Sequence, residues 1–282
     1  MRLTNRRLLV ALLAALPACD ADFDPPSLLR DLRILALVAE PLEVGPGQEV
    51  RVAPTVYLPP GQALRRQSWS FCPFSAGATV GFACAVPACE TPLLPGPDGS
   101  ITARPDQLAL ACAARVPAAS TAIPEELPDR FEVLFRYRAE ASDGAAREAV
   151  ARVPFWTAGP PASPNRPPVV TEVRVGDQPV PAGGQAAAVG QDQEVEVEVH
   201  LDPQSLDTFV DEAGRLRTEE AIVSFFASTG RFEDDLGAGL EVKTTWKVEE
   251  VDPVEDRAVV YVVVRDLRGG QTVFGPVEIP LT

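Results

Sequence analysis

The sequence is poor in the side chains that most enzymes use for acid–base and nucleophilic chemistry. It contains a single His among 282 residues, and it has no glycine-rich loop of the kind that binds nucleotides. Any catalysis of the Ser-His-Asp or Cys-His type would have to use His200, which ends an alternating segment and is expected to be an ordinary surface residue. We therefore predict a protein that is not an enzyme and has no catalytic residues and no cofactor.

Positive charge is also scarce. The chain has 25 Lys and Arg residues against 40 Asp and Glu residues, which gives a formal net charge of −15. Nucleic acids and anionic membrane surfaces attract basic proteins, so this charge excludes both as electrostatic partners. An apolar content of 46% and a charged content of 23% are typical of a globular protein rather than a disordered one.

The apolar run near the N-terminus is too short to span a membrane. Residues 8–16 (LLVALLAAL) are apolar without interruption, whereas a spanning helix needs about 20 such residues. The run follows Arg2, Arg6 and Arg7, and a short apolar segment behind a positive N-terminus is typical of a cleaved secretory signal. The sequence predicts that residues 1–18 are a signal peptide.

A cysteine follows this run in the segment Leu16-Pro17-Ala18-Cys19, which resembles the lipobox of bacterial lipoprotein precursors. The resemblance implies cleavage before Cys19, lipidation of its sulfur and a membrane partner through this anchor, since two or three acyl chains hold a protein stably. It implies the cell envelope of a Gram-negative bacterium, at the outer membrane or at the periplasmic face of the inner membrane. The alternative is an ordinary signal peptide cut after Ala18, with Cys19 a free thiol.

Proline marks the boundaries in the rest of the chain, and 29 prolines leave little room for long helices. The densest stretch, residues 158–168 (AGPPASPNRPP), is expected to be an extended linker. It separates residues 30–157 from residues 169–282, and each part has the right size for one β-sandwich. Residues 19–29, which are acidic and contain Pro25-Pro26, are expected to be a short tether behind the lipidated Cys19.

Both parts show the sequence pattern of β-strands. Residues 194–201 (EVEVEVHL) and 131–138 (FEVLFRYR) alternate with a period of two, which a half-buried strand requires. Residues 258–264 (AVVYVVV) form a continuous apolar run that fits a strand covered on both faces. Further strands are expected at residues 32–38, 49–58, 67–74, 147–156, 169–175, 221–227, 240–248 and 271–279. Strands with turn signals between them predict an all-β protein of antiparallel sandwiches.

Several segments resemble bacterial immunoglobulin-like (Ig-like) surface modules. They are residues 33–37 with Gly45-Pro46-Gly47, the linker residues 164–168, and residues 263–266 with Gly269-Gly270. The resemblance implies two Ig-like antiparallel β-sandwich domains in tandem. It also implies a non-catalytic role in adhesion, structural support or assembly of a surface complex, with a protein or glycan partner in the envelope. The antibody-type Cys–Trp–Cys pattern is missing, because the second part has no Cys.

The four remaining cysteines all lie in the first part. In an exported protein, the even set of Cys72, Cys84, Cys89 and Cys112 predicts two disulfides. Three pairings are open. A zinc site of four thiolates is the alternative, although such sites usually present paired Cys two to four residues apart.

Acidic loops in the second part raise calcium as the one ion to consider. Asp202, Asp207, Asp211 and Glu212 form one group and residues 233–235 form another, and Ca²⁺ prefers six to eight oxygen ligands. A calcium-dependent or carbohydrate-binding surface module is therefore the alternative function. Neither group matches the spacing of a known calcium loop, so solvated loops are the simpler interpretation. Residues 202–220 are expected to contain a short helix and are the first place to look for a partner surface.

Overall fold

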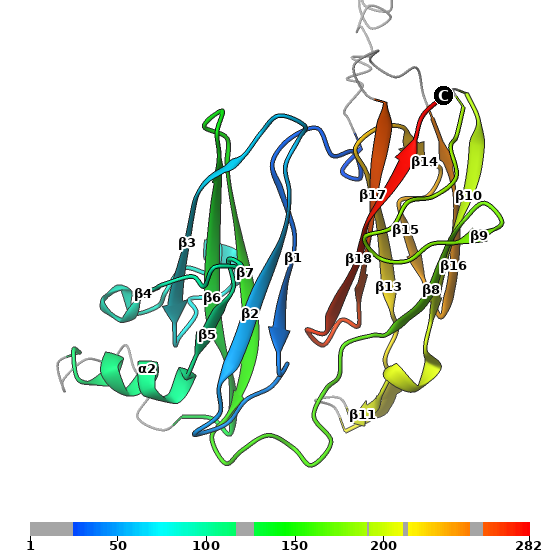
Figure 1. The fold of residues 1–282 in the computed structure, drawn as a ribbon. Coiled ribbons are helices and arrows are strands. Elements are labelled where there is room, and N and C mark those ends of the chain that lie inside the picture. Colours follow the sequence, from blue (N-terminus) through cyan, green and yellow to red (C-terminus); the bar gives the residue numbers. More distant parts are fainter. Residues whose placement is uncertain (1–24, 117–126, 191, 211–213, 249–255) are drawn as a thin grey trace, which may run out of the picture.

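A computed structural model describes residues 25–116, 127–190, 192–210, 214–248 and 256–282. These residues form two β-sandwiches that lie side by side, with their strands running in roughly the same direction (Figure 1). The predicted signal peptide and Cys19 lie outside the described residues. Within the described part of the chain, no helix has the length and apolar character needed to cross a membrane.

The first sandwich consists of two antiparallel sheets, with the strand orders β1-β2-β5 and β4-β3-β6-β7. The strands β1 to β7 are Arg33–Glu40, Val50–Tyr57, Leu64–Cys72, Thr91–Leu93, Ile101–Ala103, Arg130–Ala141 and Ala146–Trp156. The alternation in β3 and β6 turns Trp69, Phe71, Phe135 and Tyr137 inward, where they are almost fully buried. Trp69 packs on Tyr137 and Phe71 on Phe135, with ring centroids 4.7 and 5.4 Å apart, so cross-strand aromatic pairs form the core.

The second sandwich pairs the sheet β14-β16-β10-β8-β9 with the sheet β15-β13-β17-β18. The strands of the first of these sheets, in chain order, are β8 Val170–Val175, β9 Gln178–Pro179, β10 Glu194–Leu201, β14 Arg231–Phe232 and β16 Glu241–Lys247. Those of the other sheet are β13 Ile222–Ala227, β15 Leu236–Ala238, β17 Arg257–Arg265 and β18 Gln271–Pro280. As the alternation in β10 predicts, Val197, Val199 and Leu201 are buried in the core with Trp246 and Phe225.

Both sandwiches have the strand order of an Ig-like fold. In each, the first two long strands pair with each other and with a later strand in one sheet. The third long strand lies between a short edge strand and the final hairpin in the other sheet. Ig-type sandwiches divide their strands between two sheets in the same way. The predicted fold class, two Ig-like antiparallel β-sandwiches, is therefore confirmed by the strand order.

Two local expectations differ from the structure. The helix expected within residues 202–220 is wrong: this segment forms one 3₁₀ turn, η4 (Pro203–Ser205), and the hairpin β11 (Thr208–Val210) with β12 (Leu216–Thr218). Its β-branched residues favour paired strands over a helix. The sequence patterns also did not predict α2 (Pro105–Ala113), which begins with Pro at its first turn, where the missing N–H has no helical partner to lose.

The end of the expected tether is packed rather than free. Leu28 forms a parallel bridge with Ala227 of β13, and Leu29 is buried in a cluster between the sandwiches. The main-chain N–H of Ala227 donates to the carbonyl of Ser27. Residues 27–29 of the expected tether are therefore part of the folded structure.

Candidate interaction groove between the two sandwiches

The two sandwiches meet through an apolar contact between sheet faces. Leu35 and Ala36 on β1 and Tyr57 on β2 pack against Val263 on β17. The ring of Tyr57 also meets that of Tyr261 edge to face, with the centroids 6.4 Å apart. This contact explains why β17 is apolar on both faces: one face fills its own sandwich and the other fills the contact.

Side chains of the second sandwich also cover the free edge of β1. Among the described strands it pairs only with β2, so its other edge would expose backbone groups. The guanidinium of Arg265 donates to the carbonyl of Leu35 at 2.9 Å, and the side-chain amide of Gln271 donates to the carbonyl of Leu37 at 2.5 Å. Burial at this position lowers the pKa of Arg265 below its usual range. The contact therefore protects an edge strand that would otherwise invite foreign pairing.

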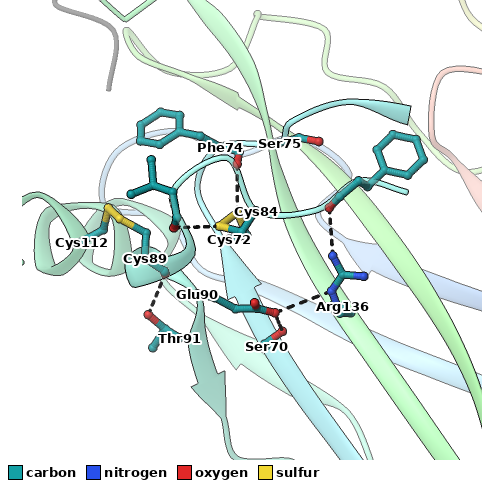
Figure 2. The surroundings of a disulfide bond; sticks show 12 residues. Ser70, Cys72, Phe74, Ser75, Cys84, Cys89, Glu90, Thr91, Cys112 and Arg136 are labelled. Carbon is teal, nitrogen blue, oxygen red and sulfur yellow. Dashed lines mark hydrogen bonds and ion pairs between the residues drawn. A yellow bond between two sulfur atoms is a disulfide. The ribbon is translucent and has the colours of Figure 1, made fainter. Parts of the chain in front are cut away.

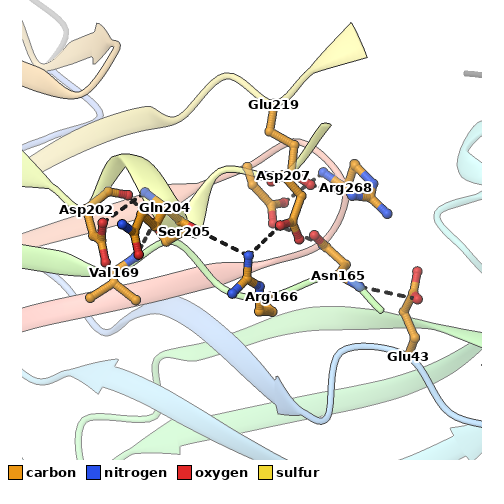
Figure 3. A network of polar contacts seen from close by, with 11 residues as sticks. Glu43, Asn165, Arg166, Val169, Asp202, Gln204, Ser205, Asp207, Glu219 and Arg268 are labelled. Atoms are coloured by element: carbon orange, nitrogen blue, oxygen red, sulfur yellow. Dashed lines mark hydrogen bonds and ion pairs between the residues drawn. The ribbon is translucent and has the colours of Figure 1, made fainter. Parts of the chain in front are cut away.

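A polar network joins the linker to both sandwiches (Figure 3). Asn165, which is 5% exposed, donates its main-chain N–H to Glu43 of the first sandwich at 3.4 Å and its side-chain amide to Asp266 of the second at 3.0 Å. Asp266 shapes the β17–β18 turn by accepting the N–H groups of Arg268 and Gly270, both at 2.8 Å. A Cβ at Gly270 would collide with the Asp266 carboxylate, so this turn requires glycine.

The network contains a buried carboxylate, that of Glu219, and the guanidinium of Arg268 pairs with it. Its carboxylate accepts from Arg268 at 2.5 Å and from the N–H of Asp207 at 2.8 Å. Burial is the main influence on Glu219 and raises the pKa of its carboxyl above the usual value, against the effect of these two donors. The Arg268 guanidinium in turn lies 4.6 Å from the centre of the Phe209 ring, which fixes the β11–β12 hairpin against the β17–β18 turn.

A groove of about 1060 Å³ opens beside this contact. Residues 34–37 of β1 and 149–152 of β7 form one side, and the other side comes from the β17–β18 turn and from Phe209 and Val210 of β11. Val210 and Leu267 are 65% and 70% exposed. The groove therefore combines strand backbone with apolar side chains that are open to solvent, as interaction sites often do.

The charge of the groove is opposite to that of the whole chain. Its charged lining residues are Arg130, Arg152, Arg265 and Arg268 against Glu43 and Glu132, whereas the chain carries a net charge of −15. Arg130 also stacks over Trp156 at 5.8 Å. No Ser, Thr, Cys, His, Lys, Tyr or Asp is among the described residues that line it, and its acidic groups are the carboxylates of Glu43 and Glu132.

The structure brings the four predicted cysteines together in two pairs. Cys72 pairs with Cys84 and Cys89 with Cys112, with Cα atoms 5.6 and 4.8 Å apart (Figure 2). This arrangement selects one of the three pairings that the sequence left open and leaves no thiolate set for zinc. The pairs tie α2 and the segment after β3 to the first sandwich, and Phe82 within the Cys72–Cys84 loop lies against Arg152 at the groove.

The acids that suggested calcium are used in local contacts or lie apart. Asp202 caps η4 by accepting the N–H of Gln204 at 2.8 Å, and Asp207 accepts from Arg166 at 2.6 Å. Asp211 and Glu212 lie outside the described residues. Residues 233–235 connect β14 to β15 and are separate in the sequence from Asp202 and Asp207. The loop acids that are described do not gather their carboxylates into a shared cluster of three.

His200 lies on the outer face of β10 beside two carboxylates. Its Nε2 is 2.9 Å from Glu198, and Glu241 lies opposite on β16; within the described chain this is the one set of three potential metal ligands whose atoms converge within 4.8 Å. The ammonium of Lys243 already contacts Glu198 at 2.9 Å and Glu241 at 3.4 Å. The Lys243 hydrogen bond is the main reason why the pKa of Glu198 is lowered, so a lysine supplies the cation here.

Comparisons with known proteins give weak similarities only. No family model matches the chain, and no curated protein matches it. Among solved structures, the D00-D0 domain of intimin is 11% identical with a TM-score of 0.25, covering 89% of this chain and 98% of that one. The N-terminal Ig1-2 module of the Drosophila receptor protein tyrosine phosphatase DLAR is 12% identical with a TM-score of 0.28, covering 89% and 99%. The fold assignment therefore rests on the strand order described above.

Proposed function

We propose that this chain is a non-catalytic, lipid-anchored protein of the Gram-negative cell envelope that supports the assembly of a surface complex. The observation that carries the proposal is the groove between the sandwiches, which combines exposed apolar side chains, arginines and strand backbone at a fixed contact. A partner that adds to this surface would bury apolar area and meet hydrogen-bonding groups, which is the chemistry of protein interfaces. Assembly fits this surface better than carbohydrate capture, because it presents strand residues of β1 and β7 next to the exposed apolar side chains of Val210 and Leu267.

The partner surface can be tested by photo-crosslinking in native envelopes. A crosslinking amino acid at Val210, which is 65% exposed in the groove, should give an adduct of defined mass. The same amino acid at Leu94, which is 94% exposed and lies after β4 in the disulfide-bonded region, should give none. Equal labelling from both positions, or none from Val210, would contradict a binding role for the groove.

The anchor is tested separately through Cys19. Cys19→Ser removes the sulfur that would carry the lipid, so the protein should move from the membrane fraction to the soluble envelope fraction, because stable attachment needs the acyl chains. Ala18→Ser is the matched control, since it keeps a small residue before the cysteine and should leave the protein with the membranes. A Cys19→Ser protein that still sediments with membranes would refute lipid anchoring.

A further inference from the structure

Three side chains that can bind a metal lie next to one another on the outer face of the β14-β16-β10-β8-β9 sheet. The contact with the first sandwich uses β17, in the other sheet of the second sandwich, so this face points away from the first sandwich (Figure 1). Val199 and Leu201 of β10 are buried, so Glu198 and His200, which alternate with them, point outward. In the β10–β16 register, His200 lies opposite Glu241. Paired strands therefore hold all three residues at adjacent positions.

The ligand atoms of these residues already converge. The Nε2 atom of His200 lies 2.9 Å from the carboxylate of Glu198, and one ligand atom from each of the three residues lies within 4.8 Å of the other two. A tetrahedral zinc ion with bonds of about 2.1 Å needs ligand atoms about 3.4 Å apart. Glu198 and His200 are already this close, and the side chain of Glu241, which is 56% exposed, can rotate toward them.

A cation already lies between the two carboxylates. The ammonium of Lys243 is 2.9 Å from Glu198 and 3.4 Å from Glu241. This side chain is flexible and 46% exposed, so it can leave without a change in the backbone. The hydrogen bond to Glu198 is the main reason why the pKa of Lys243 is raised, and the charge of Glu196 adds to it. Glu196 is therefore close enough to receive the displaced ammonium.

The chemistry of the ligands selects the kind of ion. Imidazole nitrogen binds Zn²⁺ and other divalent transition metals, whereas Ca²⁺ and Mg²⁺ prefer sets of oxygen ligands. Metal-bound histidines commonly donate their second ring N–H to a carboxylate, and Glu172 of β8 lies opposite His200 on the side away from β16. Glu172 also lies 3.8 Å from Arg174. Once the ammonium has left, the two ligating carboxylates balance the charge of a divalent ion.

We propose that Glu198, His200 and Glu241 bind a divalent transition-metal ion of the zinc type, and that Lys243 takes its place when the metal is absent. The ion ties β10 to β16 through their side chains. The inference does not depend on the proposed function, because none of the described residues that line the groove belongs to this sheet. A failure of metal binding and a failure of crosslinking at Val210 are therefore separate results.

Zinc binding is measured on the exported chain carrying Cys19→Ser and no polyhistidine tag, so that neither a free thiol nor added histidines compete. His200 is the one histidine of the sequence, so its imidazole nitrogen signals in NMR report on this site alone. Adding Zn²⁺ should move the Nε2 signal, and calorimetry should show one ion bound per chain with a Kd of about 10 μM. Ca²⁺ at about 1 mM should leave the signal in place.

The two lysines of β16 provide a matched pair of variants. Lys243→Met removes the resident ammonium and should tighten Zn²⁺ binding about fivefold, because the metal no longer has to break two exposed ion pairs. Lys247 lies two residues further along the same face, 3.8 Å from Glu194, and Lys247→Met should leave the affinity unchanged. A general attraction of Zn²⁺ to an acidic surface would be strengthened equally by both variants.

Variants of the ligands complete the test. His200→Gln and Glu241→Gln should each weaken Zn²⁺ binding at least about tenfold. The metal-free melting curves should be preserved, because both side chains lie on the outer face of the sheet. A parent chain that does not bind Zn²⁺, equal tightening by both lysine variants, or binding that survives both Gln variants would each overturn the proposal. An imidazole signal that Ca²⁺ moves as much as Zn²⁺ does would overturn the choice of ion.

Discussion

Single polar residues decide how the loops of this protein join its sheets. Asp98 is the clearest case: its Oδ1 accepts the N–H and the hydroxyl of Ser100 at 3.1 and 2.7 Å, and its Oδ2 accepts from Arg51 of β2 at 2.5 Å. The Ser100 hydroxyl, followed by Arg51, lowers the pKa of this carboxyl from 3.8 to about 2. The ionised form therefore fits the folded protein better than the protonated form.

The pKa of Asp98 predicts a pH-dependent loss of stability. Because the folded-state pKa lies below the ordinary value, the carboxylate stabilises the fold above pH 3.8, and this contribution disappears as the pH falls toward 2. Asp98→Asn should lower the melting temperature by about 2–4 °C near neutral pH, and the difference should vanish near pH 2. Circular dichroism melts of both proteins across this range provide the measurement. A difference that stays the same at all pH values would show that charge at Asp98 is not the cause.

At the scale of elements, strands with a regular pattern were predictable and their partners were not. The alternation in β10 and β6 identified the buried faces, because one strand face meets one core. Leu134 breaks the rule: it points to the outer face of β6 yet is 1% exposed. The segment between Cys72 and Cys89 lies near this face, where the carbonyl of Phe82 accepts from Arg136. Local alternation contains no information about such a covering segment.

The candidate groove was beyond prediction for a related reason. Its walls come from four separate stretches of the chain, namely β1 with Glu43, the facing parts of β6 and β7, β11, and the β17–β18 turn, which only the packing of one sandwich on the other brings together. The sequence did contain one trace of that packing, the continuous apolar run in β17. That run predicts a strand covered on both faces, and the burial of both Val262 and Val263 confirms it. The run alone does not indicate that its second face packs against β1 of the other sandwich.

The whole molecule is held by its sheet faces rather than strung along a linker. The proline-rich residues 158–168 suggested an extended spacer, but Asn165 within them is buried and bonds to both sandwiches. Thr272 of β18 also donates its hydroxyl to the carbonyl of Pro168 at 2.5 Å. The linker therefore fixes one end of a contact that Leu35, Tyr57 and Val263 continue. Separating the sandwiches would expose that apolar face and the β1 edge together.

Two neighbouring valines of β17 separate domain docking from domain folding. Val263 faces the other sandwich and Val262 faces the core of its own, and both are buried. Val263→Asp places an unpaired charge in the contact, which is costly only while the sandwiches stay together. The sandwiches should therefore part, and the radius of gyration from small-angle scattering should rise from about 18 Å, the value for a compact body of this length, to about 24 Å, with the circular dichroism spectrum of β-structure retained.

Val262→Asp, one residue away, is the matched control. Its charge would lie in the core of the second sandwich, where no opening of the contact relieves it, so that sandwich should lose its cooperative melting transition. The two outcomes differ because adjacent residues of a strand point to opposite faces. If Val263→Asp left the radius of gyration unchanged with both transitions intact, the sheet faces would not be what holds the sandwiches together. The groove, whose two sides come from different sandwiches, would then lack a fixed shape.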